Sequence, residues 1–125
     1  PALAQTEDPP QDSPAIEVEI QFGTDIDRET RSLVDAGTVF PPEVGKVFCW
    51  TRVVGAPAAT TITHAWYHEG QTMARVDLKV GSPDWRTWSA KRYLPAWTGH
   101  WEVKVLDEAG KVLASGSFTI EQETP

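Results

Sequence analysis

Apolar and polar residues alternate with a period of two along much of the chain, which predicts β-strands with one buried face. The clearest case begins at Ile16, where Ile, Val, Ile and Phe take every second position and Glu or Gln stands between them. The pattern predicts strands over residues 16–22, 38–40, 46–54, 60–68, 72–80, 86–94, 100–106 and 111–121. Turn-forming residues separate these segments, and Glu69-Gly70 predicts a tight hairpin between the strands that flank it.

Segment 25–34 is charged and lacks strong alternation, so either a loop or one to two helical turns would fit it. Elsewhere, seven or eight strands with short turns and no long helical period predict an all-β fold. We expect an immunoglobulin-like antiparallel β-sandwich over residues 15–121. Residues 1–14, rich in Pro and acidic residues, predict a disordered linker, and residues 122–125 a short C-terminal tail.

Three side chains occupy positions that are typical of such a sandwich. Cys49 and Trp66 stand where the second strand carries a Cys and the third strand a Trp, and Trp101 stands where a Tyr enters the penultimate strand. We therefore expect Trp66 and Trp101 in the core. The chain has one Cys, which excludes an intramolecular disulfide, and its apolar neighbours favour a buried, unreactive side chain.

Tryptophan and charge are unevenly distributed along the 125 residues. All six Trp residues lie between positions 46 and 101, so either the core is rich in Trp or some indoles are displayed for binding. The net charge is −7, but residues 1–45 carry 10 acidic and 2 basic residues, whereas residues 46–120 carry 6 acidic and 9 basic. The Trp-rich part is mildly basic, too weakly to predict nucleic-acid binding.

Residues Ala2-Leu3-Ala4-Gln5 have the form of a signal-peptidase site. The polar, Pro-rich stretch behind them is of the kind that often follows such a site. The sequence has no run of about 18 apolar residues that would predict a transmembrane span. We expect export to the periplasm or the extracellular space, with a removed N-terminal segment as a candidate membrane anchor.

Residues that could carry catalysis or bind a metal are sparse. The lone Cys lies in an apolar run, no Ser stands in a G-x-S-x-G motif, and most acidic residues are remote from the Trp residues. His64 and His68 share a strand face but stand about 13 Å apart, too far for one ion, and His100 is the only other imidazole. We expect no catalytic residue, metal or cofactor.

The strongest indication of function is an aromatic and basic face on two predicted strands. Trp50 and Arg52 point to one side of their strand, and His64 and Trp66 point to one side of the next. If these strands pair, the side chains form one surface on which indoles can stack on sugar rings while Arg and His bind hydroxyl groups. The alternative is burial in the core, which is the better interpretation for Trp66 and stays open for Trp50.

A second indication is the sequence Trp85-Arg86-Thr87-Trp88, which begins close to a turn. Burial of a large ring is difficult at such a place, so Trp85, Arg86 and Trp88 are candidates for a displayed binding surface. The alternative is that Trp85 folds back to cap the end of the sandwich with an Arg stacked on it.

Five blocks of sequence follow one another in the order of a known family. They are VFCWTR at 47–52, TTITHAWYH at 60–68, ARVDL at 74–78, WRTWS at 85–89 and WTGHW at 97–101. Through them, residues 39–120 resemble the bacterial domain-of-unknown-function family 2914. The resemblance implies a small, mostly exported domain that is sometimes joined to other modules, and it implies no mechanism.

Together these patterns predict a non-catalytic exported binding module whose ligand is a glycan or a cell-envelope polymer. The predicted ligand contacts are Trp50, Arg52, His64, Trp85, Arg86 and Trp88. The alternative is a periplasmic protein–protein interaction or assembly domain that uses the same aromatic surface. The sequence leaves the oligomeric state open.

Overall fold

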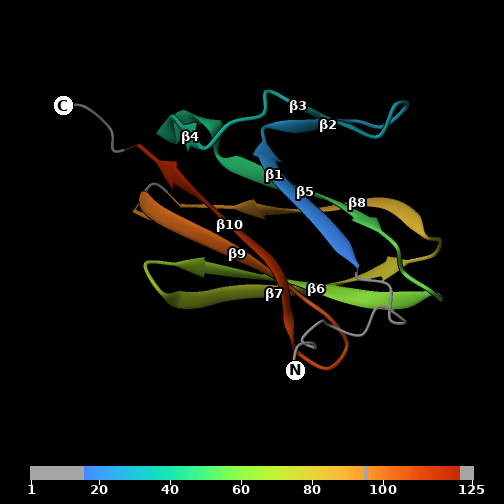
Figure 1. The fold of residues 1–125 in the computed structure, drawn as a ribbon. Helices are drawn as coiled ribbons and strands as arrows, with labels where there is room; N and C mark the ends of the chain where they lie inside the picture. Colours follow the sequence, from blue (N-terminus) through green and yellow to red (C-terminus); the bar gives the residue numbers. More distant parts are fainter. Residues whose placement is uncertain (1–15, 95, 122–125) are drawn as a thin grey trace, which may run out of the picture.

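Two β-sheets pack face to face in the computed structural model, which describes residues 16–94 and 96–121 (Figure 1). The three-stranded sheet has the order β1 (Glu17–Gly23), β5 (Lys46–Val54) and β8 (Asp84–Arg92). The five-stranded sheet has the order β4 (Val39–Phe40), β10 (Val112–Ile120), β9 (Gly99–Leu106), β6 (Thr60–His68) and β7 (Gln71–Val80). Neighbouring strands are antiparallel, except that β4 and β10 are parallel.

This strand order is that of an immunoglobulin-like sandwich, as the sequence predicts. β1, β5 and β8 take the places of strands A, B and E, and β10, β9, β6 and β7 those of G, F, C and C′. The described residues form ten strands rather than seven or eight, because two strands of three residues each, Asp25–Asp27 and Ser32–Val34, are too short to show an alternating pattern. The expected linker 1–14 and tail 122–125 lie outside the described residues.

A short β-hairpin covers part of the outer face of the three-stranded sheet (Figure 1). Its strands are β2 (Asp25–Asp27) and β3 (Ser32–Val34), and a single 3-10 turn, Pro42–Val44, follows β4. Ile26 of β2 is buried against Phe48 and Trp50 of β5. Segment 25–34 is thus neither the loop nor the helical turns expected for it. The sequence could not show this, because the hairpin is held by its packing on β5 rather than by a local pattern of apolar residues.

The core between the two sheets contains Trp66 and Trp101, which are 0% and 1% exposed. Both predictions for these rings are confirmed. The Trp101 ring stacks on Phe118, with ring centroids 5.9 Å apart. Its indole N–H donates a hydrogen bond to the carbonyl oxygen of Trp97 at 2.9 Å. This is the bond to upstream backbone that a Tyr makes at the same corner of immunoglobulin domains, so a Trp takes that role here.

Cys49 is a buried member of the same core, as expected from its apolar neighbours. Burial raises the pKa of its thiol, so the side chain stays protonated in the folded protein. Disulfide reagents react with the thiolate, which is therefore scarce as long as the protein is folded. We expect native protein to give no reaction with an aromatic disulfide reagent, and unfolded protein to react completely. Rapid labelling under native conditions would show that the sandwich opens near β5.

Among the described residues, no helix is long and apolar enough to cross a membrane.

Candidate functional site

Strands β5 and β6 follow one another in the chain but belong to opposite sheets. β5 pairs with β1 and β8, whereas β6 pairs with β7 and β9. Trp50 and Arg52 lie on the outer face of the three-stranded sheet, and His64 and Trp66 point into the core. The continuous surface expected from these four residues therefore does not exist. The physical reason is that alternation defines the two faces of a strand but not its partner in the sheet.

His64, expected among the ligand contacts, is completely buried between the sheets. Its Nε2 lies 2.8 Å from the hydroxyl of Thr51, and its Nδ1 lies 2.6 Å from the hydroxyl of Ser89. Ser89 also accepts a hydrogen bond from the indole N–H of Trp66 at 3.1 Å. The neutral ring is fully paired in the core and is out of reach of a surface ligand, so we correct its assignment to a structural residue.

Burial lowers the pKa of the His64 imidazole from 6.5 to about 4. The cause is desolvation, because the two hydroxyl partners carry no charge that would stabilise the imidazolium. His64 is therefore neutral at neutral pH and is held as one donor and one acceptor between two hydroxyl groups.

The other imidazoles do not gather into a metal site. His68 lies 2.8 Å from the carbonyl oxygen of Thr98 through Nε2, and its ring packs 4.8 Å from that of Trp101. Within residues 16–94 and 96–121, no group of three or more His, Cys, Asp and Glu side chains is placed to hold a metal ion.

The remaining predicted contacts come together on the outer face of the three-stranded sheet. In the pairing of β5 with β8, Trp50 lies opposite Trp88 and Arg52 lies opposite Arg86. Trp85 is near this face but turns toward the end of the sandwich, where it packs against core residues and contacts Gly81. The capping alternative is therefore the one that describes Trp85.

The hairpin β2–β3 covers these indoles through Arg31. Its carbonyl oxygen accepts a hydrogen bond from the indole N–H of Trp50 at 3.0 Å. Its guanidinium lies 5.6 Å from the ring centre of Trp85 and 5.0 Å from that of Trp88, within the range of cation–π attraction. Trp50 is only 9% exposed as a result, so it forms the floor of the site rather than an open stacking surface.

Two shallow hollows remain between the hairpin and the sheet, and together we call them the hairpin groove. The first, of ≈ 270 Å³, is lined by Gln21, Ser32, Leu33, Ala36, Trp50, Arg52 and Arg86. The second, of ≈ 460 Å³, is lined by Arg31, Ser82, Asp84, Trp85 and Arg86. The two hollows meet at Arg86, which lines both.

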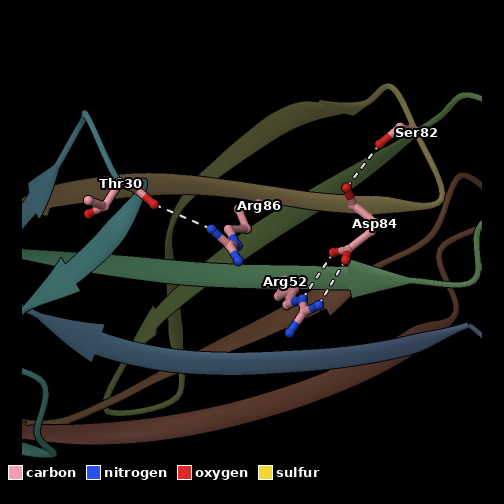
Figure 2. Close-up of polar contacts among 5 residues, drawn as sticks. All are labelled: Thr30, Arg52, Ser82, Asp84 and Arg86. Carbon is pink, nitrogen blue, oxygen red and sulfur yellow. Dashed lines mark hydrogen bonds and ion pairs between the residues drawn. The ribbon is translucent and has the colours of Figure 1, made fainter.

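An ion pair fixes the guanidinium of Arg52 at the groove (Figure 2). Its Nε and Nη2 donate to the two carboxylate oxygens of Asp84 at 2.9 and 2.8 Å. The pair lowers the pKa of Asp84 and raises that of Arg52. Ser82 donates a hydrogen bond to the backbone carbonyl of Asp84 at 2.9 Å and holds the turn that presents the carboxylate. The pair is exposed, so its main effect is to orient the two side chains.

No pattern in the sequence indicates that the hairpin residues Arg31 and Ser32 are part of the site. Arg31 acts through contacts with the backbone carbonyl of Arg86 and the ring of Trp88, about 55 positions further along the chain, for which no local pattern exists. The backbone of Arg31 is left-handed, with a φ of 57°, which is uncommon for a residue other than Gly. This conformation could not be recognised from the sequence.

We expect the hairpin to be displaced in Gly23→Ala. A β-carbon at Gly23 would lie 2.7 Å from the side chain of Leu33 and closer still to the carbonyl oxygen of Val34, so the hairpin must move. The variant should lose about 1–3 kcal/mol in the free energy of unfolding, measured with urea, and its Trp fluorescence should be quenched more readily by acrylamide.

Gly37→Ala is the matched control for Gly23→Ala. It lies in the connection after the same hairpin, and a β-carbon there meets nothing within 4 Å. Equal stability and equal quenching of the two variants would contradict the tight packing of the hairpin on the sheet.

The fold and the groove define the class of the protein: an immunoglobulin-like β-sandwich domain with a groove under an added hairpin. Residues 59–120 match the model of the family described as "Protein of unknown function (DUF2914)". Trp85, Arg86 and Trp88 lie inside the matched range, whereas Trp50 and Arg52 precede it. A search of curated proteins found no match.

Proposed function

We propose that the chain is a non-catalytic, exported binding module whose hairpin groove binds a glycan or a related cell-envelope polymer. The observation that carries this proposal is the pair of hollows that meet at Arg86, lined by guanidinium groups, small polar side chains and indoles. Binding sites typically combine apolar walls with a few well-placed polar groups. Two adjoining hollows suit successive units of a polymer.

The groups that line the groove have complementary roles toward a sugar. The side chains of Gln21 and Arg86 can donate hydrogen bonds to hydroxyl oxygens, and the hydroxyl oxygen of Ser32, which donates to the carbonyl of Thr30, can accept one. Trp85 provides ring surface for the apolar face of a sugar in one hollow, and Trp50 forms the floor of the other, with its indole N–H already bonded to the hairpin. Guanidinium and indole groups do not act as nucleophiles or bases at neutral pH, and both carboxylate oxygens of Asp84 are occupied by Arg52, which favours binding over catalysis.

Export is the second part of the proposal. It is supported by the motif Ala2-Leu3-Ala4-Gln5 and by the Pro-rich residues that follow it. A periplasmic or extracellular location would place the groove where envelope polymers are present.

Titration of intrinsic Trp fluorescence with a panel of neutral and acidic polysaccharides tests the binding proposal. A polysaccharide that occupies the groove should change the emission, because Trp85 lines one hollow and Trp50 the other. The change should shrink in Trp85→Phe, whose circular dichroism spectrum serves as the folding control. A flat response to every member of the panel would contradict glycan binding.

A protein–protein interaction or assembly domain is the second candidate. It is favoured by four large apolar side chains that are exposed on the surface of the described part of the chain: Val34, Val39, Leu94 and Val112. Light scattering over a range of protein concentrations tests this candidate for self-association. A mass that rises with concentration supports it, and a constant monomer mass argues against self-assembly.

A further inference from the structure

The hairpin groove is positively charged, although the whole chain has a net charge of −7. Arg31, Arg52 and Arg86 line the two hollows, together with a single carboxylate, that of Asp84. The charge of the lining is therefore opposite in sign to that of the chain, which favours an anionic partner at this place.

The charges of Arg52 and Arg86 are not balanced equally. The two residues stand directly opposite each other in the pairing of β5 with β8, an arrangement that is unfavourable for like charges. Arg52 is compensated by its ion pair with Asp84 and by Glu19, its opposite neighbour on β1. Arg86 lies on β8, the edge strand of its sheet, and among the described residues it has a cross-strand neighbour on one side only. Asp84 attracts its guanidinium but forms its ion pair with Arg52 instead.

Arg86 lines both hollows, and most of the hydrogen-bond donors of its side chain have no protein partner within the part of the chain that the structure describes. Among residues 16–94 and 96–121, its side chain makes one hydrogen bond, from Nη1 to the carbonyl oxygen of Thr30 at 3.3 Å (Figure 2). This distance is at the long end for an N–H···O bond. The planar fork of a guanidinium matches a carboxylate, and the bidentate pair of Arg52 with Asp84 shows that geometry a short distance away.

We infer, on the basis of the proposed function, that the glycan bound in the hairpin groove is acidic and carries uronic acid units. Arg86 binds the carboxylate of one unit through its fork. Arg52 stays paired with Asp84 and adds positive charge beside it. The neighbouring hollow, lined by Arg31 and Trp85, takes the adjoining unit.

Isothermal titration calorimetry with matched polymers tests this inference. The probes are polygalacturonate and its fully methyl-esterified form, which share a backbone and differ in charge. Alginate and hyaluronate are further uronate polymers, dextran is a neutral polymer, and dextran sulfate is its sulfated counterpart. Wild-type protein should bind at least one uronate polymer about tenfold or more tightly than the methyl ester and dextran. Arg86→Gln should lose that preference, and Arg86→Lys should keep part of it, because a charge remains without the fork.

Arg92→Gln is the control for Arg86→Gln. Arg92 is exposed at the other end of β8, outside the lining of both hollows, so this change should leave the affinities as they are. Circular dichroism spectra equal to wild type show that each variant is folded.

The outcomes separate the inference from the proposed function. Binding of dextran or the methyl ester as tightly as the uronate polymers, with no effect of Arg86→Gln, overturns the inference and leaves glycan binding in place. Preference for dextran sulfate over every uronate polymer, lost in Arg86→Gln, overturns the carboxylate assignment in favour of a sulfate ester. Absence of binding to every polysaccharide overturns both.

Discussion

Acidification from about pH 7 to about pH 4 should lower the free energy of unfolding by about 3 kcal/mol through His64 alone. The folded protein lowers the pKa of this ring from 6.5 to about 4, so the unfolded chain takes up a proton more readily. The contribution of His64 is therefore complete above pH 6.5 and is lost as the pH falls from 6.5 toward 4. Its cause is burial between Thr51 and Ser89 with no carboxylate to balance a charge.

Urea unfolding at a series of pH values, for wild type and His64→Gln, measures this effect. Gln keeps hydrogen-bonding groups for the two hydroxyls but does not titrate. The free energy of unfolding of this variant should therefore change much less between pH 6.5 and 4 than that of wild type. His100→Gln is the control, because it makes the same exchange of side chains at an exposed position. A wild-type protein equally stable at both ends of this range would show that His64 is not buried as a neutral ring.

Trp66→Ala should have the largest effect of any single substitution considered, a loss of about 3–5 kcal/mol in the free energy of unfolding. Trp66 is completely buried, and its ring packs edge-on against Phe118 with ring centroids 6.1 Å apart. Removal of the Trp66 ring leaves a cavity between the sheets, and Ser89 loses the hydrogen bond that the indole N–H donates to it. Because whole domains are stable by about 5–15 kcal/mol, the variant should be close to unfolding at room temperature.

Trp97→Ala is the matched control for Trp66→Ala. Trp97 is half-buried, and its contribution to the corner is a backbone carbonyl that the substitution retains. The loss should be smaller, about 1–2 kcal/mol, in thermal or urea unfolding. A Trp66→Ala protein no less stable than Trp97→Ala would contradict the placement of Trp66 at the centre of the core.

The strands of this fold could be predicted closely because their local patterns are strong. β5 and β6 begin and end at the residues expected from alternation, since β-branched and aromatic side chains occupy every second position. The turn at Glu69-Gly70 has φ angles of 50° and 84°, the left-handed pair that a two-residue hairpin requires and that Gly favours.

The site could be predicted only in part, because its assembly depends on contacts between distant segments. Trp50, Arg52, Arg86 and Trp88 were found from their residue types, and the register of β5 against β8 brings them together. Alternation could not show that β5 is buried on both faces, on one by the core and on the other by the hairpin. For the same reason His64, which looks like a surface group in the sequence, is a core residue.

Binding in the hairpin groove is tested most directly by nuclear magnetic resonance of the six indole N–H groups during titration with oligogalacturonate. The signals of Trp50, Trp85 and Trp88 should shift, because these rings line the groove or lie under Arg31 at its edge. The signals of Trp66 and Trp101, buried between the sheets, should stay in place. Unchanged signals from all of the first three rings, with binding detected by calorimetry, would place the ligand elsewhere on the domain.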